Sequence, residues 1–188
     1  MTVFEKPGKE NTEAALRIAL QAAAEKGYTL VVASNTGETV STLLKLQEET
    51  GLSAKVVMVG QVDGFAAPGT NALKPEMRAA LEEKGVRIVT AAHALSGAER
   101  GMSRKFGGVY PAELVAYSLR MLSQGTKVCV EIGMMALDCG SIEYGKPVVC
   151  VGGTGRGADT VCILTPAYTA NLFDTQIHEI LCKPGLYE

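Results

Sequence analysis

Hydroxyl, amide and glycine residues gather directly after a buried-looking, strand-like run early in this chain. They are Ser34, Asn35, Thr36, Gly37, Glu38 and Thr39. A helix is expected to begin here, and a helix N-terminus offers unpaired backbone N–H groups and a partial positive charge. The segment therefore predicts a phosphate site at a strand-to-helix turn. The alternative is that the same residues only cap the helix. The segment matches neither a Walker A loop nor a GxGxxG turn.

A second candidate site is a glycine-rich stretch between two expected strands. Its residues are Gly153, Thr154, Gly155, Arg156 and Gly157. Glycines allow backbone amides to face an anion, and the Arg156 guanidinium can add a planar pair of donors. The alternative is a flexible hairpin whose glycines only permit positive φ angles. Asp159, which follows, is expected to cap a turn rather than to act as a base.

Residues 91–110 form a third candidate segment, longer than a routine connection. It contains one acid, Glu99, and several basic or hydroxyl residues, which are His93, Ser96, Arg100, Ser103, Arg104 and Lys105. Because the segment follows a buried strand, we predict that it forms a basic lid over the carboxyl ends of the strands. Its glycines are expected to prevent a long helix. The alternative is a solvated surface loop with a short helix. His93 is either an acid–base group that titrates near neutral pH or a structural histidine.

Two other titratable residues have weaker cases. Glu131 lies within an expected strand and either faces a site or marks the end of that strand. His178, on the last expected strand, is interpreted as a structural or interface residue. No metal site is expected, because the five cysteines are at least ten residues apart and form no CxxC pair.

The elements that must position these residues follow from apolar patterning. Continuous apolar runs predict strands buried on both faces, as in a parallel sheet; they cover residues 29–33, 55–59, 86–90, 128–132, 147–151 and 160–164, with an edge strand over 176–182. Helical spacing and Pro or Gly boundaries predict helices before 27, over 40–51, 75–85 and 111–125. The chain is thus predicted to be one α/β domain, residues 1–188. It has three layers, a mainly parallel sheet with helices on both faces, and an antiparallel or hairpin edge near the C-terminus. Ligands of such sheets bind at the carboxyl ends of the strands.

Composition narrows the possible functions. The chain has 188 residues, of which 47% are hydrophobic and 20% charged, with a formal charge of −2. This excludes intrinsic disorder and offers no electrostatic basis for binding nucleic acid or an anionic membrane. The odd number of cysteines and the absence of a secretory segment predict free thiols in a reducing cytoplasm. No apolar run is long enough to span a bilayer.

Several of these segments together resemble the C-terminal α/β domain of pyruvate kinase. The matching pieces are residues 13–24, 30–39, 127–132 and 153–161, in that order along the chain. Residues 93–108 look similar to stand-alone archaeal and bacterial relatives of that domain. The resemblance implies that the turn from Ser34 to Thr39 binds a phosphate and that the glycine-rich loop closes over it. It also implies no pyruvate kinase activity, since the catalytic residues of that enzyme belong to a separate barrel. The stand-alone relatives suggest flavin mononucleotide (FMN) as the ligand.

Three functions are therefore open at this point. The first is a binding module for a small phosphorylated ligand such as FMN. The second is an enzyme acting on a phosphorylated metabolite in the same pocket, with His93 as general acid or base and Arg100 or Arg104 holding the anion. The third is a regulatory or oligomerisation domain whose loops are only structural. A homo-oligomer is expected in any case.

Overall fold

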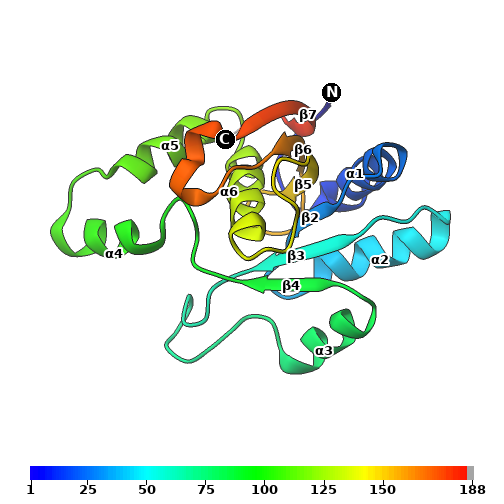
Figure 1. Cartoon of the computed structure of the whole chain (residues 1–188), viewed down its shortest axis with the longest axis horizontal. Coiled ribbons are helices and arrows are strands. Elements are labelled where there is room, and N and C mark those ends of the chain that lie inside the picture. The colour runs from blue at the N-terminus through cyan, green and yellow to red at the C-terminus, as the bar shows by residue number, and fades with distance from the viewer. Residues whose placement is uncertain (186–188) are drawn as a thin grey trace.

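The strands form a single sheet in the computed structural model, which describes residues 1–185 (Figure 1). In spatial order they are β1 (Thr2–Phe4), β7 (Gln176–Pro184), β6 (Thr160–Thr165), β5 (Val148–Gly152), β2 (Leu30–Ala33), β3 (Val56–Gly60) and β4 (Arg87–Thr90). β6 is antiparallel to β5 and β7, and the other neighbouring pairs are parallel. The predicted mainly parallel sheet with antiparallel pairing near the C-terminus is confirmed.

Helices cover both faces of the sheet, which gives the predicted three layers. One face packs against α1 (Thr12–Lys26), α2 (Glu38–Thr50) and α3 (Pro75–Glu83), and the other against α5 (Pro111–Arg120) and α6 (Gln124–Asp138). Successive strand residues alternate between these layers, since Val32 belongs to the first cluster and Val31 to the second. Side chains on both faces of the central strands are therefore buried against helices. This is why the sequences of these strands are continuously apolar rather than alternating.

The prediction of a strand over residues 128–132 is wrong, because this segment lies in the middle of α6. From Gly125 to Leu137, every residue of this helix except Val128 is buried. A Cβ atom on Gly125 would lie 2.2 Å from Thr160 Oγ1, so glycine is what allows the helix to approach β6 so closely. A helix buried on all sides and a strand buried on both faces give the same unbroken apolar pattern.

Three further expectations need correction. The helix that starts at Pro111 ends at Arg120, and Gly125 lies inside the next helix, which Ser123 caps by accepting a hydrogen bond from Thr126 N at 2.8 Å. β7 is not an edge strand, because the unpredicted strand β1 pairs with it. Register shifts opposite β6 interrupt the alternation of its side chains, and Ile177 and Ile180 both pack against the same core cluster.

The chain order creates a crevice beside β2. From β2 the chain proceeds to β3 and β4 on one side, whereas β5 lies on the other side of β2. The loops that follow β2 and β5 therefore leave the same edge of the sheet in divergent directions, which is where ligands bind in sheets of this kind. Within residues 1–185 no helix has the length and apolar character needed to cross a membrane.

Candidate functional site

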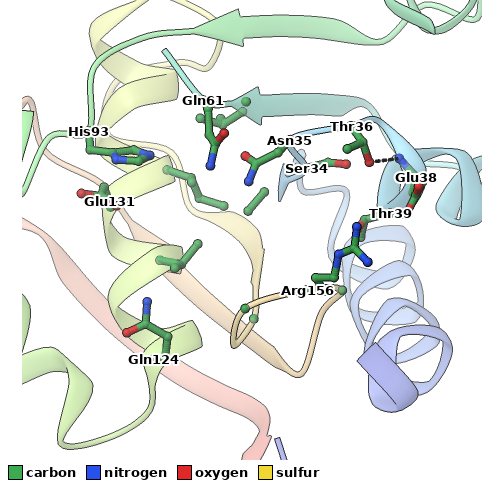
Figure 2. Close-up of a pocket in the computed structure, with 18 of the residues that line it drawn as sticks. Ser34, Asn35, Thr36, Glu38, Thr39, Gln61, His93, Gln124, Glu131 and Arg156 are labelled. Carbon is green, nitrogen blue, oxygen red and sulfur yellow. Dashed lines mark hydrogen bonds between the residues drawn. The ribbon is translucent and has the colours of Figure 1, made fainter. Parts of the chain in front are cut away.

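A cavity of about 620 Å³ opens at this crevice (Figure 2). Three segments that the sequence singled out separately all line it, and the lining residues among them are Ser34, Asn35, Thr36, Glu38, Thr39, His93, Arg100, Gly153, Gly155, Arg156 and Gly157. Six residues that the sequence singled out in these segments do not line it, namely Gly37, Ser96, Ser103, Arg104, Lys105 and Thr154. The fold thus brings the β2–α2 turn, the glycine-rich loop and the start of the 91–110 segment to one place.

The β2–α2 turn is held by its own polar groups. Gly37 N donates to Ser34 Oγ at 3.2 Å. Glu38 N donates to Thr36 Oγ1 at 3.5 Å, which Figure 2 shows as a dashed line. Gly37 has a φ of 91°, and a Cβ there would lie 2.7 Å from Met77 Cγ, so this glycine shapes the turn against α3. The side chain of Thr39 lines the cavity. Its hydroxyl forms no hydrogen bond within residues 1–185 and is available to a ligand.

The glycine-rich loop is docked rather than free. Asp159 is fully buried, and its Oδ2 accepts hydrogen bonds from Thr154 N at 3.1 Å and from Gly8 N at 3.2 Å. Ala158 N donates to Thr12 Oγ1 at 3.1 Å. The loop is therefore fastened to the segment before α1. Asp159 accepts bonds within a turn, as the sequence predicted.

A buried ion pair forms another part of the wall. Lys127 Nζ donates to Glu131 Oε2, and the two side chains are only 5% and 4% exposed. Glu131 Oε1 also accepts a hydrogen bond from Leu95 N at 3.0 Å. Glu131 thus has partners and faces the cavity. It is neither inside a strand nor at the end of one.

The titration of two cavity groups is shifted by burial. Burial lowers the pKa of His93 below its ordinary value, although the nearby Glu131 carboxylate opposes this shift. Burial also lowers the pKa of Lys127, again against the pull of Glu131. His93 packs edge-on against the Phe65 ring, with 5.3 Å between ring centroids. The neutral imidazole is therefore favoured at this wall.

Several lining residues were not identified from the sequence. They are Lys9, Thr12, Gln61, Phe65, Arg120, Gln124 and Lys127. Lys127 and Glu131 are four residues apart, a spacing that signals a pair only if the segment is a helix. Lys9 and Thr12 arrive through the long-range docking of the N-terminal segment, which no local pattern indicates.

The cavity is basic although the chain is slightly acidic. Five Lys or Arg side chains line it against two Glu side chains. Lys127 is neutralised by Glu131, but Lys9 and Arg156 form no ion pair in the described part of the chain. Figure 2 shows Thr39 and Arg156 toward one end of the site and His93 and Glu131 toward the other. The Thr39 end of the cavity therefore holds Arg156 without an ion-pair partner among the described residues, and Glu38 supplies one negative charge there.

The 91–110 segment contains α4 (Gly97–Phe106), which lies beyond the sheet layers in Figure 1. Gly101 lies within this ten-residue helix, so the expectation that the glycines interrupt it is wrong there; Gly107 ends it, with a φ of 72°. Arg100 lines the cavity and lies over the Phe65 ring at 5.6 Å, whereas Arg104 does not line it. The segment borders the cavity at one side, and its closure as a lid stays a prediction.

The remaining candidate groups lie elsewhere. His178 Nε2 is 2.8 Å from Thr165 Oγ1 on the neighbouring strand, outside the cavity. The five cysteines are free, and four of them are buried. Among residues 1–185 no three His, Cys, Asp or Glu side chains are grouped so that they could hold a metal ion. A scan of the sequence against models of known protein families finds no family that matches it.

Proposed function

We propose that this cavity binds a small phosphorylated ligand, with its phosphate between the β2–α2 turn and the glycine-rich loop. The observation that carries the proposal is the convergence of these two loops at the crevice beside β2, where Thr39 and Arg156 line one basic cavity. A helix N-terminus, a hydroxyl and a guanidinium are all suited to a phosphate. Capping alone would not require an unpaired threonine and an unpaired arginine at the same place.

FMN is the specific ligand that we propose. A volume of about 620 Å³ lies within the range of small-molecule sites, and the wall around His93 and Phe65 supplies aromatic surface beyond the phosphate end. The choice of FMN rests on the resemblance of residues 93–108 to stand-alone relatives of the pyruvate kinase C-terminal domain. Both this relationship and the ligand are proposals. We likewise propose a cytoplasmic protein without pyruvate kinase activity.

Replacing Thr39 with valine is expected to weaken binding of FMN and of inorganic phosphate by about 1–3 kcal/mol, or roughly 5- to 150-fold in Kd. The substitution removes a hydroxyl that lines the cavity and keeps the shape of the side chain. Isothermal titration calorimetry measures both ligands. The matched control is Thr50→Val at the far end of the same helix, where the hydroxyl bonds Leu46 O. Equal affinities in the wild type and Thr39→Val would contradict the phosphate site.

We also propose that the chain self-associates through α4 and α5. No residue of α4 is buried, and seven large apolar side chains from α4 to just beyond α5 are exposed, namely Met102, Phe106, Val109, Leu114, Tyr117, Met121 and Leu122. A short helix that buries nothing gains little stability from its own domain. A second copy of the chain would cover this surface in a homo-oligomer.

Light scattering on a sizing column is expected to give a mass at least twice that of one chain. Phe106→Glu with Met121→Glu is expected to lower this to one chain, because each change places a charge in an apolar contact. Lys105→Glu is the control, since it adds a negative charge to the same helix without removing apolar surface. A wild-type monomer at every concentration tested would refute the assembly.

A further inference from the structure

The Lys127–Glu131 pair is unusual because it is both buried and part of the cavity wall. A buried ion pair is weak evidence for stability, since apolar residues of similar volume are often as stable. A lysine shielded from bulk water and facing a ligand cavity is, in contrast, the arrangement in which an amine becomes a nucleophile. The position of the pair therefore points to chemistry on the ligand.

We propose that Lys127 forms a Schiff base with the aldehyde or ketone carbonyl of a phosphorylated ligand, and that Glu131 is its proton partner. The inference rests on the proposed function, because the phosphate end of the ligand is assigned to the Thr39 side of the same cavity. The substrate class is accordingly a small phosphorylated aldehyde or ketone.

The geometry of the pair allows a direct proton transfer from Lys127 to Glu131. Lys127 Nζ donates directly to Glu131 Oε2, so one proton can pass between them without water. The other carboxylate oxygen is held by Leu95 N at 3.0 Å, which fixes the orientation of the acid. Burial disfavours the ammonium of Lys127, and transfer of one proton to Glu131 leaves neither side chain charged.

The electrostatic surroundings favour the neutral amine as well. Burial is the main reason that the pKa of Lys127 is lowered, and the positive charges of Arg120 and Arg100 act in the same direction. Both arginines line the same cavity. Glu131 is the opposing influence, and it favours the ammonium until it accepts the proton.

The reaction balances with these two residues alone. Lys127 gives one proton to Glu131, and its neutral nitrogen adds to the carbonyl carbon. One proton then moves from nitrogen to the former carbonyl oxygen, which yields a carbinolamine. Glu131 returns its proton to this hydroxyl as the C–O bond breaks, so that water leaves and a protonated Schiff base remains beside a carboxylate. No oxidant or metal takes part.

The test is reductive trapping on the wild-type protein. The protein is incubated at pH 7 with glyceraldehyde 3-phosphate and sodium cyanoborohydride, and labelled lysines are located by peptide mass spectrometry. Each unit by which a lysine pKa falls raises the neutral fraction about tenfold at this pH. Lys127 is therefore expected to be labelled faster than the exposed Lys45 and Lys105, which serve as internal controls.

Two comparisons make the result specific. Glu131→Gln removes the charge that favours the ammonium of Lys127, so it raises the neutral fraction of the amine. Labelling is nevertheless expected to slow, because the amide cannot deliver the proton with which the carbinolamine loses water, although it can still accept from Leu95 N. Unphosphorylated glyceraldehyde is expected to label Lys127 more slowly than the phosphorylated probe, and excess inorganic phosphate is expected to slow only the phosphorylated probe. Circular dichroism confirms that the variant is folded.

The outcomes separate the two proposals. Labelling of Lys127 no faster than that of Lys45, in protein that binds phosphate, would overturn the Schiff-base inference and leave the proposed function intact. Fast labelling by both aldehydes without any effect of phosphate would support the reactive lysine and overturn the phosphate site.

Discussion

Glu131→Leu is expected to lower the free energy of unfolding by about 3–5 kcal/mol, the cost of removing one partner from a buried ion pair. The leucine leaves Lys127 without its counter-ion and Leu95 N without its acceptor. Both Lys127 and Leu95 are buried, so water cannot readily replace the lost partner. Guanidinium unfolding followed by circular dichroism measures the change.

Two companion variants separate the causes of this loss. Glu131→Gln is expected to cost less than the leucine variant, because its amide oxygen can still accept from Leu95 N. The double variant Lys127→Met, Glu131→Leu is expected to recover part of the loss, because no charge is left buried. If Glu131→Leu costs under about 1 kcal/mol, as at an exposed pair, the buried pair as described here is refuted.

Gly157→Ala is expected to be the second large effect, on both stability and phosphate binding. Gly157 has a φ of 73°, and a Cβ there would lie 2.3 Å from Thr12 Oγ1 and 2.7 Å from Lys9 Cα. Since Lys9 Cα belongs to the backbone, the loop and the N-terminal segment must move apart. We expect roughly 1–3 kcal/mol from overpacking, beyond the strain of the positive φ. Phosphate binding should weaken, because the glycine-rich loop shifts.

Gly155→Ala is the matched control for this variant. It has the same φ of 73° in the same loop, but a Cβ there meets nothing within 4 Å. It therefore carries only the backbone strain, about 1–2 kcal/mol. Thermal unfolding and phosphate titration of the two variants compare them directly. Equal effects on both measurements would show that loop docking on Lys9 and Thr12 has no role.

The sequence predicted the sheet well where local pattern and burial agree. The runs at β2, β3 and β5 are short, β-branched and bounded by polar or glycine residues, so they match strands and little else. Polar residues follow β2 and β5, and the parallel order brings them together. The two loops of the candidate site were therefore predictable, although their convergence on one cavity depends on the crevice beside β2.

Two parts of the site depended on information that no local pattern contains. Lys127 and Glu131 were hidden because α6 is buried on all sides, which removes the polar face that marks a helix. Lys9 and Thr12 reach the cavity only because the N-terminal segment docks on the glycine-rich loop, for example through Gly8 and Asp159. Contacts between positions so far apart in the chain arise from tertiary packing alone.

The pairing of β1 with β7 has a consequence for the order of folding. Thr2 lies opposite Cys182, so the first strand has no place in the sheet until the last one has formed. The segment that carries Lys9 and Thr12 begins only a few residues after β1. Its N-terminal end is therefore fixed in place only once β1 has paired with β7. On a ribosome, the cavity would therefore be completed only after β7 has emerged, and contacts of such sequence separation slow folding.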